Sequence, residues 1–176
     1  MLASHLAGLK PTSIGIGRVT ICAEPGAVLV VPDLGPGVAV VICDPMLDVA
    51  GVLHCLLPDS EMDRVRAATR PGLFLDTGLD ALLEAAEPWD MDRNRMRVFA
   101  AGSARAMGSA DHFNPGRANR EALRSELEKR GLKLAAQHLN GFHNRSLYLL
   151  METGELIVHV SGQAMGTVLC RNWTPI

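Results

Sequence analysis

Short apolar runs separated by tight turn signals dominate the first third of the chain. Residues 27–31, 38–43 and 49–57 are rich in β-branched residues, and runs of this length and composition are typical of buried strands. Turn residues at 32–37 and at Asp44-Pro45 separate them. Three such strands in close succession predict a mainly antiparallel or mixed sheet that is buried on both faces.

Two later segments have helical periodicity. Residues 75–86 place leucines at helical spacing and are followed by Pro88, which ends a helix. Residues 117–130 give the clearest helix, in which Glu126 and Arg130 can pair at four-residue spacing. Gly131 then suits the position after a helix end.

The remaining strands are shorter. Residues 14–21 alternate loosely and predict a strand ahead of the three apolar runs, and residues 95–101 and 132–136 predict two more. Residues 147–151 and 155–160 flank a Glu-Thr-Gly turn and predict a hairpin. Together the patterns favour an α+β fold with about eight short strands and two main helices.

Two segments lack such patterns. Residues 60–71 carry three arginines and two acidic residues, so we expect a polar surface loop there. Its cluster of Arg64, Arg66 and Arg70 is interpreted as a solvated face, with docking of an acidic partner as the alternative. Residues 161–176 have no strong pattern and are either a strand packed on the core or a loose tail.

Length and composition favour one soluble domain. The chain has 176 residues, 48% of them hydrophobic and 20% charged, with a net charge of −2. Both charge signs are scattered and aromatic residues make up only 4%, which argues against nucleic-acid binding. No apolar run approaches the length of a membrane span, and the first ten residues do not resemble a secretory signal. We therefore expect a cytoplasmic domain over 1–176, with a core at about 14–160.

The cysteines and histidines give no metal signature. Cys22, Cys43, Cys55 and Cys170 form no C-x-x-C pair, and most lie in apolar runs, as expected for core thiols in a reducing compartment. His138 and His143 occur near Asn140, Asn144 and Arg145, and a polar surface cluster is a simpler interpretation than a metal site. No cofactor or metal is predicted.

The sequence around the second and third runs resembles the signature of the CheD family. In that family a Leu-Gly-Ser-Cys turn opens a strand, and a Gly-x-x-His-x-x-Leu-Pro segment follows. Here the matching segments are Leu34-Gly35-Pro36-Gly37 and Gly51-Val52-Leu53-His54-Cys55-Leu56-Leu57-Pro58. Weaker similarities follow in the family's order at Asp76-Thr77, at 101–104, at 116–123, at 144–146 and at 152–154.

The resemblance implies a chemistry and a fold. CheD proteins deamidate glutamine side chains on chemoreceptor helices, and the implied fold is a layered sandwich of stacked mixed sheets flanked by helices. The implied catalytic trio is a cysteine nucleophile at position 37, a histidine base at position 54 and an orienting threonine at position 31. Thiolate attack on the amide carbon, followed by hydrolysis of the thioester, needs such a trio.

This chain retains one of the three. It has Gly37 in place of the nucleophile, His54 at the base position and Val31 in place of the threonine. Losing the nucleophile of a comparable triad lowers turnover on the order of 10⁶-fold. Rescue by Cys43 is disfavoured, because six strand residues separate it from position 37 by roughly 20 Å. Cys55 adjoins His54, so we expect its side chain on the opposite face of the strand.

Three functions are therefore open. The chain can be a non-catalytic CheD-like protein that binds chemoreceptor cytoplasmic helices or a CheC-type phosphatase. It can instead be an active deamidase with a displaced nucleophile or an activated water, or a domain repurposed for an unrelated ligand. In the first and third cases, His54 is a buried strand histidine with a backbone partner.

Overall fold

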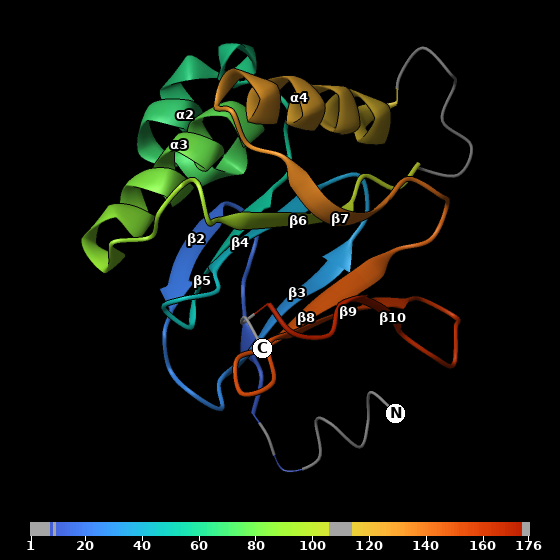
Figure 1. Ribbon diagram of the computed structural model, residues 1–176. Helices are drawn as coiled ribbons and strands as arrows, with labels where there is room; N and C mark the ends of the chain where they lie inside the picture. The colour runs from blue at the N-terminus through green and yellow to red at the C-terminus, as the bar shows by residue number, and fades with distance from the viewer. Residues whose placement is uncertain (1–7, 9, 106–113, 174–176) are drawn as a thin grey trace.

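The fold consists of two stacked five-stranded sheets, with helices covering one of them (Figure 1). The computed structural model describes residues 8, 10–105 and 114–173. The order in the first sheet is β1 (Thr12–Ser13), β3 (Val28–Leu34), β8 (Arg145–Leu150), β9 (Glu155–Val160), β10 (Thr167–Cys170). The order in the second sheet is β2 (Arg18–Cys22), β5 (Val49–Cys55), β4 (Val38–Asp44), β6 (Arg97–Gly102), β7 (Leu134–Leu139).

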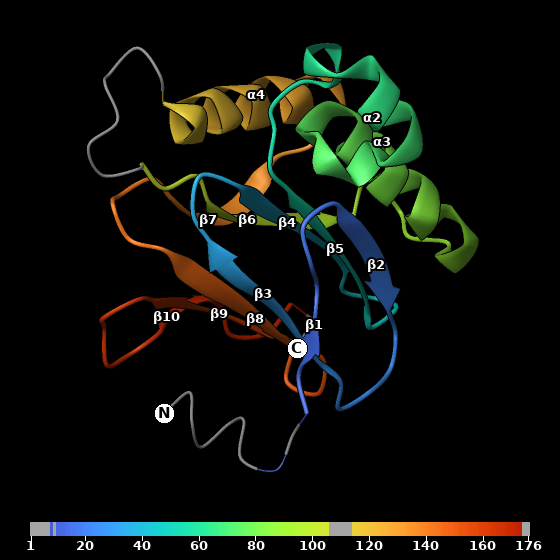
Figure 2. The ribbon, with the colours of Figure 1, turned by 180° about the vertical axis from the view of Figure 1, so that it is seen from behind.

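Both sheets are mixed, as the sequence predicts. The β1–β3 and β6–β7 pairs are parallel, and the other neighbours are antiparallel. The predicted hairpin is formed by β8 and β9. Figure 2 shows the same layers from behind, with β1 beside β3 at the edge of the first sheet. The architecture is an α+β layered sandwich.

The second sheet is buried on both faces because it lies between two apolar cores. Every residue of β4 and β5 is buried. Alternate residues of β4 point in opposite directions, so Ala39, Val41 and Cys43 join the core between the sheets. Val38, Val40 and Ile42 join the core beneath the helices. Continuous apolar runs are therefore required in these strands.

Two helices lie where periodicity predicts them. They are α3 (Leu75–Ala86) and α4 (Pro115–Lys129), and the predicted Glu126–Arg130 ion pair is present. Asn114 caps α4 by accepting a hydrogen bond from the Arg117 amide at 2.9 Å. No described helix is long and apolar enough to cross a membrane.

The prediction of a loop over 60–71 is wrong. This segment contains a 3₁₀ turn (Ser60–Met62), the helix α2 (Arg64–Thr69) and a second 3₁₀ turn (Pro71–Leu73). Asp63 caps α2 by accepting a hydrogen bond from the Arg66 amide at 2.9 Å. Only Ala67 of α2 is buried, so the helix has no apolar periodicity to reveal it.

The predicted strand over 14–21 is confirmed only in its second half, because β2 begins at Arg18 and β1 (Thr12–Ser13) lies ahead of the predicted segment. β1 belongs to the first sheet and β2 to the second, and the chain crosses between them through Gly15–Gly17. Gly17 has a φ of +79°, a conformation that favours glycine, and its amide donates a hydrogen bond to the His54 carbonyl at 2.6 Å. This glycine pair therefore serves a structural turn.

Strand β3 and the C-terminal segment also extend beyond the sequence expectation. β3 continues to Leu34 through the predicted turn residues, with a register shift between Val31 and Leu34 and a positive φ at Asp33. In the C-terminal segment β10 pairs with β9, and Trp173 is buried in the core between the sheets. Residues 174–176 lie outside the described residues.

Candidate functional site

The turn between β3 and β4 is held by backbone hydrogen bonds from the end of β6. The Gly35 carbonyl accepts from the Ala104 amide at 2.7 Å, and the Gly37 carbonyl accepts from the Ser103 amide at 2.7 Å. Gly102 has a φ of +118°, and a side chain there would collide with the Gly37 carbonyl. The Ala101-Gly102-Ser103-Ala104 segment therefore holds the backbone around position 37 in place.

Asn119 of α4 secures the same turn from the helix side. Its Nδ2 donates to the Pro36 carbonyl and to the Leu56 carbonyl, each at 2.8 Å, and the residue is fully buried. Its Oδ1 has no hydrogen-bond partner among the described residues. Asn119 therefore joins the turn to the end of β5, which explains why the sequence places an asparagine on the inner face of this helix.

Gly37 leaves no space for a side chain. A Cβ atom at this position would lie 2.8 Å from the Cys55 carbonyl oxygen, closer than Cβ atoms approach other atoms in proteins. The obstacle is a backbone oxygen of β5 and does not yield to a rotamer change. Residue 37 is therefore a glycine because of close packing against β5, and not because of a left-handed backbone conformation.

His54 lies on the face of β5 that points toward the first sheet. It pairs with Ala39 across β4–β5, and position 37 precedes Ala39 by two residues, so positions 37 and 54 share a face. The His54 Nδ1 donates to the Ile14 carbonyl at 3.0 Å, and the side chain is 4% exposed. Burial lowers the pKa of His54, and the bond to Ile14 partly opposes this shift. The imidazole is therefore neutral near pH 7.

Val31 completes the set of positions that the resemblance singles out. It lies on β3 opposite Leu147, is 2% exposed, and packs in the core between the sheets. Ile14, the backbone partner of His54, belongs to the same core. Positions 31 and 54 thus face one core from opposite sheets, but valine offers the imidazole no hydrogen-bonding group.

Cys55 is turned away from His54, as the alternation of strand residues predicts. It belongs to the core beneath the helices, where its Sγ donates to the Val38 carbonyl at 3.4 Å. Burial raises the pKa of the Cys55 thiol to about 12. A buried thiol with this pKa remains protonated near neutral pH and is a poor nucleophile.

The other three thiols lie toward the far end of the core between the sheets. Cys43 and Cys22 both pair with Ala50, which precedes His54 by four residues on β5, a separation of about 13 Å. Burial raises the pKa of Cys43 well above its usual value, and the neighbouring Cys170 raises it further. Thus no cysteine of the described chain takes the place of a nucleophile beside His54.

Comparisons with known proteins agree with this arrangement of motifs. Residues 56–160 match the family model described as CheD chemotactic sensory transduction. A probable chemoreceptor glutamine deamidase CheD of Symbiobacterium thermophilum is 34% identical, with 86% of this chain and 93% of the relative covered. The chemoreceptor glutamine deamidase CheD of Thermotoga maritima is 34% identical, with coverages of 85% and 91%. The chain belongs to the CheD family.

The family match begins after the three positions that the resemblance singles out. Val31, Gly37 and His54 all lie ahead of residues 56–160, whereas the segments that follow in the family's order lie within them. The matched residues include Asn119 of α4 and the β8–β9 hairpin.

The sequence predicts a polar surface cluster around Arg145, and for Arg145 itself this prediction is wrong. It is buried, and its guanidinium donates to the carbonyls of His138, Asn140 and His143. Burial lowers its pKa. Arg145 therefore organises the loop between β7 and β8, and within this CheD-family chain it has a structural function. His138 lies beside it, with Nδ1 2.9 Å from the guanidinium.

The three arginines of the 60–71 segment already have interaction partners within the chain. Arg64 pairs with Glu61, Arg66 lies 3.5 Å from Asp63, and Arg70 donates to the Ile16 carbonyl at 3.1 Å. These contacts fit the interpretation of a solvated charged face and weaken the alternative of an acidic partner docking there.

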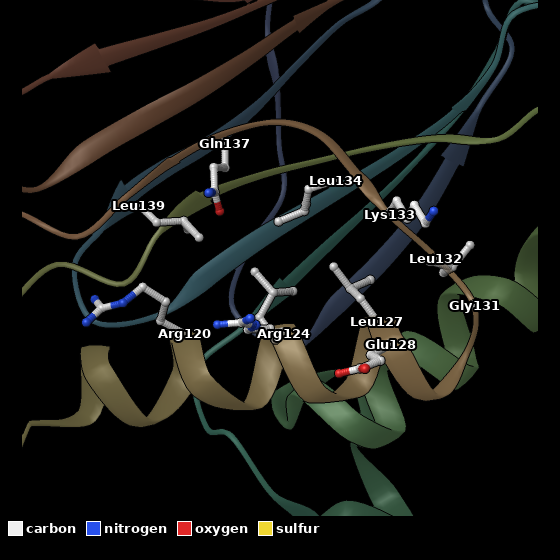
Figure 3. A pocket seen from close by; sticks show the side chains of 11 residues that line it. Arg120, Arg124, Leu127, Glu128, Gly131, Leu132, Lys133, Leu134, Gln137 and Leu139 are labelled. Carbon is white, nitrogen blue, oxygen red and sulfur yellow. The ribbon is translucent and has the colours of Figure 1, made fainter.

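A groove that the sequence does not suggest opens between α4 and β7 (Figure 3). Its volume is about 610 Å³. Pockets of about 510 and 440 Å³ also open on the described surface, and all three are lined by residues other than Val31, Gly37 and His54. The sequence shows arginines and acidic residues mixed along α4. It does not indicate which of these side chains stay unpaired, so it could not predict the groove.

Proposed function

We propose that this chain is a non-catalytic CheD-like chemotaxis protein that acts by binding. The resemblance to the family offers two partners, the cytoplasmic helices of a chemoreceptor and a CheC-type phosphatase. Several relatives are named chemoreceptor glutamine deamidases, so the chemoreceptor is the first partner to test. In this proposal the whole chain, 1–176, acts as one domain that keeps a partner-binding surface and has lost the chemistry.

The observation that carries the proposal is the packing of Gly37. A nucleophile needs a side chain, and a Cβ atom at position 37 would lie 2.8 Å from the Cys55 carbonyl oxygen. The turn is also fixed by hydrogen bonds to the carbonyls of Gly35 and Gly37, so the backbone cannot easily move aside. Restoring the family's cysteine would therefore require a change in the turn as well as a change of residue.

An active deamidase is the second candidate, because one feature of His54 favours it. The Nδ1 of His54 donates to the Ile14 carbonyl, which leaves Nε2 as the basic nitrogen of the ring. A base held in one tautomer could activate a water molecule or a nucleophile brought by a partner. Without covalent catalysis, turnover by this route would be far slower than in a cysteine enzyme.

Release of ammonia from a glutamine-bearing chemoreceptor fragment separates the two candidates. The purified chain should release none above background, while a relative such as the Thermotoga maritima CheD serves as the positive control. His54→Ala is the matched variant. Ammonia release by the natural chain that disappears in His54→Ala would establish the deamidase and overturn the proposal.

Binding is tested with the same fragment. The full chain should co-elute with the chemoreceptor fragment or with a CheC-type phosphatase in size-exclusion chromatography, and His54→Ala should not weaken the complex. Absence of a complex with either partner would leave the repurposed domain as the better interpretation.

A further inference from the structure

The groove between α4 and β7 has an apolar base. Leu123 and Leu127 of α4 face Leu134 and Leu139 on the β7 side, and Leu132 closes one end. Figure 3 shows the helix side chains and the strand side chains facing one another across the opening. β7 is the last strand of its sheet, so this wall of the groove is not covered by a further strand.

Three cations surround this base. Arg120, Arg124 and Lys133 line the groove. None of them forms an ion pair or hydrogen bond with any residue that the structure describes. On the same helix Arg117 pairs with Glu121 at 2.7 Å, so acidic partners are used elsewhere on α4. One acidic residue, Glu128, also lines the groove, which leaves its lining net positive.

Arginines continue past the groove toward the start of α4, where Arg117 is paired with Glu121. Arg120 also lines the adjoining pocket of about 440 Å³, together with Arg105 and Arg117. The chain as a whole has a net charge of −2, so this concentration of positive charge is local. A local field of this sign attracts an acidic ligand and disfavours a basic one.

We propose that the α4–β7 groove, lined by Arg120, Arg124, Lys133 and the leucines between them, binds an acidic amphipathic helix of a partner protein. The inference rests on the proposed function, because it names the surface through which a non-catalytic relative would hold its partner. The apolar side of the partner helix would cover Leu134 and Leu139, and its acidic side would face the three cations.

The spacing of the cations favours a helix as the ligand. Arg120 and Arg124 are four residues apart on α4, so their Cα atoms are separated by about 6 Å along the helix axis. Carboxylates four residues apart on a partner helix have the same spacing, and Lys133 meets that helix from the opposite wall. Binding of an amphipathic helix in an apolar groove with charged rims is a recurring mode of peptide recognition.

The test uses the full chain and a synthetic probe. The probe is a labelled helical peptide with leucines on one face and glutamates at four-residue spacing on the other, and its affinity is measured by fluorescence anisotropy at low salt. Arg120→Glu/Arg124→Glu/Lys133→Glu should weaken binding at least tenfold, and raising the salt concentration should weaken binding by the natural chain. Far-UV circular dichroism and urea unfolding verify that the variant folds.

Matched controls decide the outcome. Arg64→Glu/Arg66→Glu changes two arginines on α2 that already have acidic neighbours, and it should leave the affinity unchanged. A probe with glutamines in place of the glutamates should bind at least tenfold more weakly. Equal binding of both probes, or of the natural chain and the triple variant, would overturn the groove as an acidic-helix site. So would tighter binding of a single-stranded oligonucleotide than of the acidic peptide.

A chemoreceptor fragment separates this inference from the proposed function. If the fragment binds the natural chain and the triple variant equally, the groove inference fails and the proposed function stands. If the fragment and a CheC-type phosphatase both fail to bind the natural chain while the acidic peptide binds through the three cations, the proposed function fails and the groove inference stands.

Discussion

The turn at Gly37 and the α4–β7 groove adjoin each other, yet they have opposite physical character. At the turn, backbone carbonyls accept hydrogen bonds from Ser103, Ala104 and Asn119, and no room is left for a side chain. In the groove, cations face solvent without partners among the described residues. Asn119 belongs to the first region and its neighbour Arg120 to the second, so α4 connects a closed site to an open one.

On the proposed function, this difference explains how a family scaffold would lose its chemistry and keep a binding surface. A nucleophile depends on a single side chain in a confined space, so one glycine removes it. The proposed docking surface depends on several cations and an apolar base spread over α4 and β7, so it does not rest on one confined position as a nucleophile does. The predictions that follow separate the two regions, beginning with the largest expected effect.

Asn119→Ala should destabilise the closed region most. The change leaves the Pro36 and Leu56 carbonyls without their donor in a buried site, at a cost of about 3 kcal/mol in the free energy of unfolding. Urea denaturation measures this loss. Asn94→Ala is the control, because Asn94 bonds only within its own exposed turn. A loss as small as that of the control would mean that the turn does not depend on α4.

Gly37→Ala should cost about 2 kcal/mol, because the added methyl group must push against the Cys55 carbonyl. Gly15→Ala is the control, since the nearest atom to its new Cβ is Arg18 Cγ at 4.0 Å. Thermal and urea unfolding compare the two. Gly37→Cys should be destabilised similarly and should release no ammonia from a glutamine-bearing receptor fragment. A stable and active Gly37→Cys would refute the closed turn.

The buried imidazole should make stability depend on pH. Because the pKa of His54 is lower in the folded chain than its ordinary value near 6.5, the unfolded chain binds more protons in this range. The stabilisation is fully present above pH 6.5 and is lost as the pH falls through the lower folded pKa. Unfolding midpoints should therefore decrease from pH 7 toward pH 5, and His54→Gln should flatten that slope.

His138 provides the comparison for this pH dependence. Partial burial lowers its pKa, and the nearby Arg145 lowers it further, so it contributes in the same direction and range. His138→Gln should also reduce the slope, and the double variant should reduce it more than either change alone. An unchanged slope in His54→Gln would show that this imidazole is not held neutral by the fold.

The smallest effect is expected at the charged surface. The Arg117–Glu121 pair has side-chain exposures of 63% and 64%, and such pairs contribute little to stability. Arg117→Ala should leave the urea midpoint within experimental error. The same variant should weaken binding of the acidic peptide less than Arg124→Ala does, because Arg117 already has a carboxylate partner. A larger effect from Arg117→Ala would extend the binding surface toward the start of α4.

Local patterns in the sequence were sufficient for the parts of the fold that are buried and regular. The apolar runs of β4 and β5 predict strands because both faces are covered, and the spacing of leucines in α3 predicts a helix because one face is covered. The order of motifs was likewise enough to recognise the family, and the assignment of catalytic roles to positions 31, 37 and 54 stays a prediction. The absence of a nucleophile at position 37 is a property of the sequence alone.

Only the tertiary structure decided the rest, because it depends on contacts between distant segments. The closure of the turn arises where β5, β6 and α4 converge on Gly37, and no local pattern encodes that convergence. α2 was missed because a short capped helix with one buried residue has no periodicity. The groove was missed because whether a cation has an acidic neighbour is set by the positions of side chains in space, and the sequence alone specifies only their order.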